Sequence, residues 1–400
     1  MKKIILPIAL TVIASTLALS AADWPHWLGP NGDNTAPADS FKPDLSKWTT
    51  AWKASVGRGY SSVAVAAGRA YTLGHDEKAQ ETIFCFDAAS GALRWKHAYE
   101  AKLMPTMHPG GPNATPTIAG NRVYTVSKDG QALCLSADDG RVVWHVNLVE
   151  AMGVKTPNWG FASSPVISGN QIIYSAGKVA ALDLATGKIL WTTKNDYLAG
   201  YTTAVVFDSG GKKFVAALDG KGLSILSATD GNEIARHPFS SMFDMTATTP
   251  FVLSQGKRIF ISGNQSSDML AFDGQKLSPA WTSKEIRNTM NNSVIMGKVL
   301  YGIDGRQEDP SSRMVCVNLD DGKINWAKNN FGYGNTILVG STILALTENG
   351  ELVTVQSSPQ GYNEISRLQI LGKLCWTTPV YAEQRIFLRN DRGDVVCLAP

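Results

Sequence analysis

The side chains that most often carry catalysis are poorly placed for it in this sequence. The six histidines are scattered, and none stands in an HExxH arrangement that could bind zinc. Several serines precede proline, but none stands in G-x-S-x-G. Gly110-Gly111-Pro112 is not followed by a helical pattern, so it makes no phosphate loop. No Cys/His group has the spacing of a metal site. We therefore expect no catalytic residue and no metal site.

A binding site is a better expectation. Aromatic, amide and basic side chains recur just before the Ser or Thr that opens each of a series of repeats, where loops should converge on one mouth of a channel. Such a ring suits a flat ligand, a sugar or a peptide segment. The alternative for each residue is that it only packs its own loop. The candidates are Arg58, Tyr60, His108, Trp159, Tyr201, Asn291, Asn292, Tyr333, Asn335 and Trp376. The irregular segment 103–113 is predicted to cover part of the mouth.

The elements that position these residues follow from the repeat. Residues 181–191 read as a strand, a tight turn with Gly187 at a left-handed position, and a second strand ending in Trp191. Related units end at positions 95, 144, 191, 235, 281 and 326, at intervals of 44 to 49 residues. One four-stranded propeller blade has this length.

The number of blades follows from the number of residues that open a repeat. A Ser or Thr, usually followed by Pro or an aliphatic residue, occurs in phase at positions 62, 115, 164, 203, 249, 293, 336 and 378. We therefore predict an all-β, eight-bladed propeller of four-stranded antiparallel blades over residues 44–400. The chain ends after the third strand of the last blade, and residues 45–52 are predicted to supply the fourth and close the ring. An open solenoid would need polar caps, and the sequence has none.

The first 22 residues have the pattern of a cleaved signal peptide. Lys2 and Lys3 precede an apolar run, residues 4–19, and small residues follow with a cut expected near Ala21 or Ala22. The alternative is a transmembrane anchor, for which the run is short and lacks a stop signal. No Cys follows for lipidation. We expect a periplasmic or secreted protein, with no transmembrane segment after cleavage, that acts as a monomer.

The mature chain is nearly neutral. Removing Lys2 and Lys3 from the 37 basic residues leaves 35 against 34 acidic ones, which gives no electrostatic basis for binding nucleic acid. Residues 23–43 are expected to pack on the propeller as an N-terminal segment, pinned by Trp24, His26 and Trp27. These three are not expected to bind a ligand.

The five cysteines are predicted to be free, buried thiols that act as small apolar side chains. Cys85, Cys134, Cys316 and Cys397 take the same place in four different blades, too far apart to be bridged. Cys375 is predicted to begin the inner strand of the last blade, two strands from Cys397, or about 9 to 10 Å away.

The 181–191 unit fits A-x-D-x-x-T-G-K-x-x-W and resembles the tryptophan-docking motif of dehydrogenases that depend on pyrroloquinoline quinone (PQQ). That resemblance implies that the Trp packs between neighbouring blades. Residues 23–32, 59–62 and 159–165 look like segments of exported PQQ-like propeller proteins. Those proteins are often named after the propeller lipoprotein of the outer-membrane barrel-assembly machinery. The resemblance spans nearly the whole mature chain.

The same resemblance bears on function. PQQ enzymes use an adjacent Cys-Cys disulfide, acidic and Asn ligands for Ca²⁺, and an Asp base, together with long inserted loops. This sequence has no Cys-Cys pair, no dense Asp loop and no long insertions. No cofactor is expected. The favoured hypothesis is an exported, non-catalytic scaffold of the cell envelope that binds a protein, peptide or carbohydrate. The alternative is a PQQ-dependent oxidoreductase with Ca²⁺ and a reduced active site.

Overall fold

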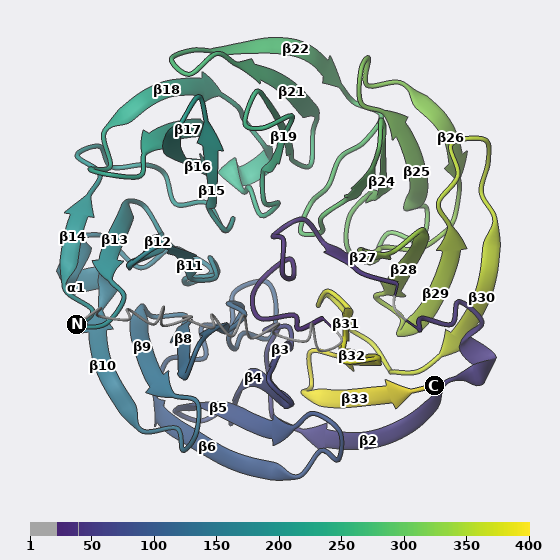
Figure 1. Ribbon diagram of the computed structural model, residues 1–400, viewed down its shortest axis with the longest axis horizontal. Coiled ribbons are helices and arrows are strands. Elements are labelled where there is room, and N and C mark those ends of the chain that lie inside the picture. Colours follow the sequence, from purple (N-terminus) through teal and green to yellow (C-terminus); the bar gives the residue numbers. More distant parts are fainter. Residues whose placement is uncertain (1–21, 39) are drawn as a thin grey trace, which may run out of the picture.

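A computed structural model describes residues 22–38 and 40–400. These residues form eight blades of four antiparallel strands each, arranged around a central channel (Figure 1), and a short fifth strand adds to the sheet of one blade. The predicted eight-bladed propeller is confirmed. The predicted signal peptide lies almost wholly outside the described residues.

In seven blades the strands follow chain order from the channel outwards. Blades 1 to 4 contain β3 (Ala64–Ala66), β4 (Arg69–His75), β5 (Gln80–Asp87), β6 (Leu93–Glu100); β7 (Thr117–Ala119), β8 (Arg122–Val126), β9 (Gln131–Ser136), β10 (Val142–Asn147); β11 (Val166–Ser168), β12 (Gln171–Ser175), β13 (Val179–Asp183), β14 (Ile189–Thr192); β15 (Val205–Ser209), β16 (Lys212–Asp219), β17 (Gly222–Ser227) and β18 (Glu233–Pro238). Blades 5 to 7 contain β19 (Phe251–Leu253), β20 (Arg258–Ser262), β21 (Ser267–Phe272), β22 (Leu277–Ser283); β23 (Val294–Met296), β24 (Val299–Asp304), β25 (Arg313–Asn318), β26 (Ile324–Lys328); β27 (Gly334–Val339), β28 (Thr342–Thr347), β29 (Glu351–Gln356) and β30 (Glu364–Gln369).

Blade 8 is built from both ends of the chain. Its inner strands are β31 (Val380–Ala382), β32 (Arg385–Arg389) and β33 (Asp394–Ala399), and its outer strand is β2 (Thr49–Ser55), which pairs antiparallel with β33. The predicted closing strand therefore exists, but it starts later than expected. Leu45–Lys47 form a short 3-10 helix, η1, because the Asp44 side chain caps the amide of Ser46.

Six tryptophans join neighbouring blades in the way that the resemblance implies. Each indole N–H donates to a backbone carbonyl of the next blade at 2.7 to 3.2 Å, and five of the rings lie on the turn glycine of that blade. At Gly187, for example, φ is +72° and a Cβ atom would lie 2.8 Å from the Trp144 ring. The six are Trp52, Trp95, Trp144, Trp191, Trp281 and Trp326.

Two seams between blades use other aromatic residues. Between blades 4 and 5, where Ala235 stands at the tryptophan position, the rings of Phe207, Phe214 and Phe272 pack together. Between blades 7 and 8, Phe41 from the N-terminal segment and Trp48, which follows η1, pack with Tyr381. The repeat is therefore interrupted where local aromatic clusters fill the space.

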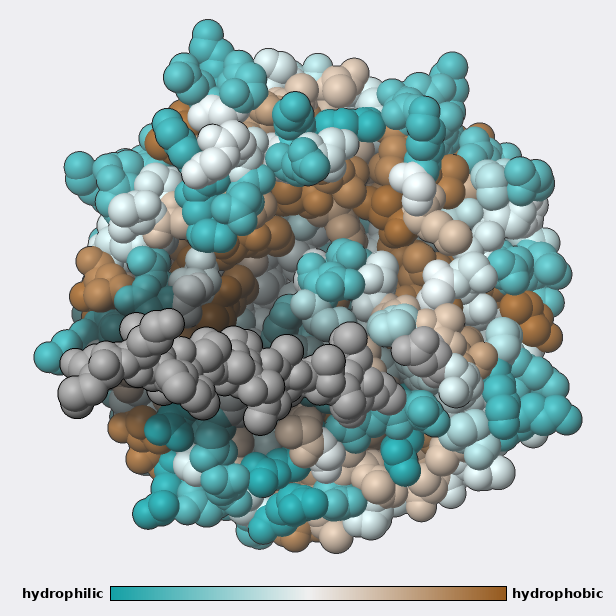
Figure 2. Space-filling model, viewed as in Figure 1, coloured by the Kyte–Doolittle hydropathy of each residue, from teal (hydrophilic) through white to brown (hydrophobic). Residues whose placement is uncertain are grey.

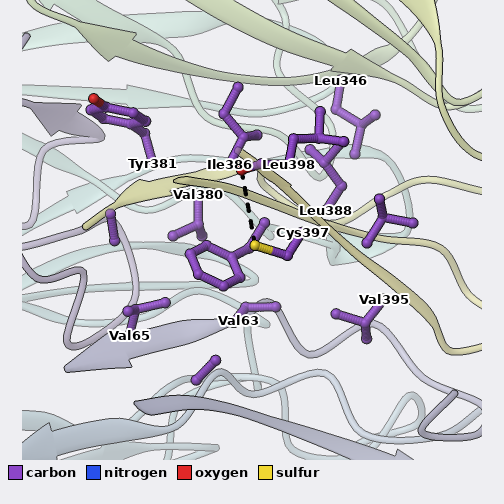
Figure 3. Packing of buried hydrophobic residues seen from close by; sticks show 14 of the residues in the cluster. Val63, Val65, Leu346, Val380, Tyr381, Ile386, Leu388, Val395, Cys397 and Leu398 are labelled. Atoms are coloured by element: carbon purple, nitrogen blue, oxygen red, sulfur yellow. Dashed lines mark hydrogen bonds between the residues drawn. The ribbon is translucent and has the colours of Figure 1, made fainter. Parts of the chain in front are cut away.

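All five cysteines are buried and free, as predicted. Cys397 pairs across the sheet with Trp52 and lies among apolar side chains such as Val63 and Val380 (Figure 3). Cys375 does not begin the inner strand, which starts at Val380. It lies in the preceding loop, where its thiol donates to the carbonyl of Gly372 at 3.2 Å.

The N-terminal segment crosses the channel (Figure 1). Trp24 forms an antiparallel bridge with Val65 of blade 1, and the carbonyl of Pro25 accepts from the amide of Ile118 in blade 2 at 2.8 Å. Further along, β1 (Thr35–Ala36) pairs in parallel with β27 of blade 7. The segment thus links blades 1, 2 and 7, which are not all neighbours of one another.

Figure 2 shows apolar residues around the central hollow of the face in view. A cavity of about 380 Å³ lies between the N-terminal segment and the inner strands β7, β11 and β15. The remaining helical elements are short: α1 (Leu148–Met152) and η2 (Met242–Asp244). No helix among the described residues has the length and apolar character needed to cross a membrane.

Candidate binding site at the channel mouth

Side chains at the blade openings form a belt of hydrogen bonds at four of the eight seams around the channel. At three of these seams the opening Ser or Thr of one blade accepts from a backbone N–H of the blade before it. At the fourth the acceptor is Asn292, next to the opening Ser293, and each bond satisfies a buried donor. The pairs, written donor first, are Ser62 to Thr115, Thr115 to Ser164, Ser164 to Thr203, and Thr249 to Asn292, at 2.8 to 3.2 Å. This explains why Ser and Thr recur at these positions.

Above the belt, the loops that lead into the inner strands surround a cavity of about 150 Å³. Five of the predicted site residues line it: Tyr60, His108, Trp159, Tyr201 and Trp376. They come from five different blade-opening loops, and the segment 103–113 contributes His108 and Asn113 to the wall. The structure therefore brings half of the predicted set together.

The rings form two groups. Tyr60 stacks on Trp376 with centroids 5.3 Å apart, and His108 meets Tyr60 edge-on at 5.5 Å. Trp159 meets Tyr201 edge-on at 5.3 Å. Among the described residues that line the cavity there is no Asp, Glu, Lys or Arg. The site is an aromatic cavity without formal charge.

The other five predicted residues make hydrogen bonds or ion pairs within the protein. Arg58 pairs with Asp391 at 2.5 Å and with Glu77 at 3.3 Å. The three asparagines and Tyr333 are buried, and each bonds to backbone groups. Their partners are Ile303 O and Thr289 N for Asn291, Thr249 N for Asn292, Met290 N for Tyr333, and Trp376 O for Asn335. These contacts fix the loops that carry the aromatic wall.

Sequence reasoning missed Trp27, Met245 and Met290, which also line the cavity. The Trp27 indole donates to Thr249 Oγ1 at 2.9 Å, so this residue both pins the N-terminal segment and forms part of the wall. Its position depends on how the segment crosses the channel. No local pattern in the sequence could have indicated it.

Buried titratable side chains lie close to His108. Lys128 is fully buried, and its Nζ lies 3.5 Å from His108 Nε2. Burial and the Lys128 charge lower the pKa of His108 to about 4, so its imidazole is neutral near pH 7. Burial lowers the pKa of Lys128 to about 8. Burial also raises the pKa of Glu81, which accepts a hydrogen bond from Tyr99, to about 8.

Glu81 should make stability depend on pH. The folded protein keeps the Glu81 proton up to about pH 8, whereas the unfolded chain releases it near 4.5. For Glu81 alone, the unfolded state therefore binds fewer protons in this window. His108 acts in the opposite sense below about pH 6.5, because the unfolded chain keeps the imidazolium proton up to that pH whereas the folded protein releases it near 4. The net free energy of unfolding should therefore fall as pH rises from about 6.5 to 8, by about 0.5–1 kcal/mol per pH unit. Glu81→Gln should flatten this dependence in guanidinium unfolding.

Glu100→Gln, at an exposed position on the adjacent strand, is the control and should keep the wild-type slope. Equal slopes for the two variants would show that Glu81 is ionised in the folded protein. Above about pH 8 the sign reverses, because the folded protein releases the Lys128 proton earlier than the unfolded chain does, near 10.5.

Comparison with known proteins agrees with the tryptophan-docked blades. A family model described as outer membrane protein assembly factor BamB matches residues 46–197 and 110–328, which together span most of the propeller. The chain belongs to this family. A BamB of Shewanella oneidensis is similar over 91% of both chains at 22% identity. The BamB of Escherichia coli is 34% identical over 20% of this chain and 22% of its own length.

Other similarities are to quinone enzymes. A quinate/shikimate dehydrogenase (quinone) of Acinetobacter baylyi is 30% identical over 27% of this chain, but the match covers only 19% of that enzyme. Among solved structures, quinohemoprotein alcohol dehydrogenase from Comamonas testosteroni has a TM-score of 0.75 at 12% identity over 95% of this chain and 81% of its own. BamB from Moraxella catarrhalis has a TM-score of 0.63 at 15% identity, over 88% and 98%. At these identities the structural likeness concerns the fold alone.

The cavity of this BamB-family chain does not fit PQQ. That cofactor carries several carboxylates, which need cationic partners, and the wall described above has none. Nor do the described residues contain a group of three or more His, Cys, Asp or Glu that could hold a metal ion, whereas Ca²⁺ requires several oxygen ligands.

Proposed function

We propose that this protein is a non-catalytic scaffold of the cell envelope that binds a protein partner through the channel mouth. The observation that carries the proposal is the exposed apolar rim beside the uncharged aromatic cavity. Met107 is 88% exposed and Phe243 is 75% exposed. Both line a groove of about 590 Å³ that shares Trp159 and Trp376 with the cavity. Exposed apolar patches of this kind mark protein interaction sites.

Membership of the BamB family supports a place in outer-membrane protein assembly, the process that gives its relatives their name. We extend that role to this chain. The leader-like sequence of residues 1–22 supports an exported, periplasmic location.

A quinone-dependent oxidoreductase is the second candidate, favoured by the similarity to the quinate/shikimate dehydrogenase. Titration of the purified protein with PQQ, with and without Ca²⁺, distinguishes the two by calorimetry and absorbance. We expect no binding, because the cavity wall carries no cation. Stoichiometric binding at about micromolar affinity would overturn the scaffold proposal.

Site-specific photo-crosslinking in the envelope tests the scaffold role directly. A photoreactive phenylalanine analogue at Phe243 should give an adduct with a component of the outer-membrane assembly machinery, identified by mass spectrometry. The same analogue at Leu93, which is 51% exposed on the outer strand β6, is the matched control and should give none. No adduct at Phe243, or the same adduct from both positions, would refute binding at the mouth.

A further inference from the structure

Four hydroxyl groups on the cavity wall make hydrogen bonds within the protein. Ser164 and Thr203 accept from the backbone amides of the preceding blades, and Thr249 accepts from the Trp27 indole. Thr377 Oγ1 donates to the carbonyl of Arg389 at 2.7 Å. Tyr60 Oη, also on the wall, is buried without a hydrogen-bond partner. The wall therefore offers a ligand mainly aromatic surface, with this hydroxyl beside it.

The composition of the cavity wall favours an apolar ligand over a sugar or a charged group. A sugar ring entering the cavity would bury several hydroxyls, and each one left without a partner costs about 1–3 kcal/mol. A charged ligand would lose its hydration without meeting an opposite charge. A large apolar side chain carries neither cost and gains contact with the rings of Trp27, Trp159 and Tyr201.

The groove beside the cavity suits the rest of such a ligand. Met245 and Met290 line both spaces, so the groove is continuous with the cavity. Met107 and Met242 extend it outwards, which places four of the ten methionines on one surface. Unbranched, polarizable methionine side chains adapt to neighbours of different shape. Arg287, Arg306, Glu308 and Asp309 also line the groove, so an extended segment lying in it would meet charged side chains as well as methionines.

We propose that the cavity is a socket for one large apolar side chain, aromatic or branched aliphatic, projected by an extended peptide segment of the protein partner. The residues that flank this side chain lie along the methionine-lined groove. The inference rests on the proposed function and specifies its ligand: the partner inserts an uncharged anchor at the channel mouth rather than presenting a glycan or an acidic group.

Two capped peptides that differ in one side chain test the socket: acetyl-Gly-Ser-Phe-Ser-Gly-amide and the same sequence with Ala in place of Phe. Binding to the purified full chain is followed by intrinsic fluorescence, since three tryptophans line the cavity, and by saturation-transfer NMR. We expect the Phe peptide to bind at least about tenfold more tightly than the Ala peptide. Methyl glucoside should not bind.

Equal affinity of the two peptides, tighter binding of methyl glucoside, or no binding of any probe up to about 5 mM would overturn the proposal. If Phe243 still gave its cross-link in that case, the socket would be refuted and the scaffold role retained. Loss of the cross-link as well would refute both.

A second test of the socket is to fill the cavity with a larger side chain. Ala162 lies on its wall, and Ala162→Leu should weaken the Phe peptide by at least about tenfold. Ala185→Leu, at an exposed turn of the same blade, is the control and should leave binding unchanged. Ala247→Leu fills the cavity from a different loop and serves if Ala162→Leu changes the circular dichroism spectrum. Undiminished binding in a folded filled variant would contradict the socket.

Discussion

Trp52→Ala should lower the free energy of unfolding by about 3–5 kcal/mol, the cost typical of removing a buried tryptophan. Trp52 is 7% exposed in the strand that closes the ring, and its indole donates to the carbonyl of Ala88 in blade 1 at 3.0 Å. The ring also lies on Gly91, where an added Cβ atom would come within 2.6 Å of it. Guanidinium unfolding followed by circular dichroism measures the loss.

The matched control is Trp159→Ala. Trp159 is half-buried at the mouth, and its ring contact is with Tyr201. We expect a loss of about 1 kcal/mol or less, because little apolar area leaves the core. Similar losses for the two variants would mean that the Trp52 contact does not hold the first and last blades together.

Arg389→Met should cost about 3–5 kcal/mol at the same seam. Arg389 is 1% exposed at the end of β32 and donates to blade 1, to the carbonyls of Ser61, Leu73 and Gly57 and to the hydroxyl of Thr72. Methionine fills a similar volume but removes the guanidinium donor from all four buried acceptors, of which the Ser61 carbonyl keeps a bond from the Thr72 hydroxyl. The measurement is again guanidinium unfolding.

Arg385→Met, on the same strand, is the control. Arg385 is only partly buried and donates to the carbonyl of Glu383 at 3.0 Å within its own turn. Its loss should cost about 1 kcal/mol or less. If Arg389→Met were no more destabilising than Arg385→Met, the hydrogen bonds of the buried guanidinium would not be what holds blade 8 to blade 1.

The fold was predictable because one local contact recurs at a fixed interval. A strand, a Gly turn and a Trp are sequence-adjacent, so the unit around Trp191 is visible without knowing the neighbours. The two seams without a docking Trp were not predictable in the same way. Phe207 and Phe214, for example, pair across one hairpin, but Phe272 comes from the next blade and meets them only in the folded chain.

The candidate site was predictable in part, for a related reason. Tyr60 and Trp376 stand at equivalent points before two inner strands, so the circular arrangement brings them together. Asn292 and Asn335 were predicted for the same reason, their position before an inner strand, but their side chains are bonded to backbone groups of adjacent blades. A position before an inner strand does not reveal whether a side chain points into the cavity or into a seam.

The sequence by itself determined the number of blades, the closure by an N-terminal strand and the free, buried state of the thiols, because each follows from spacing within a repeat. Which side chains line the cavity was determined only by the tertiary structure. Trp27 reaches it through a segment that crosses the channel, and Arg389 fastens the seam beside it. Contacts between residues hundreds of positions apart depend on how the ring closes, and no local pattern records them.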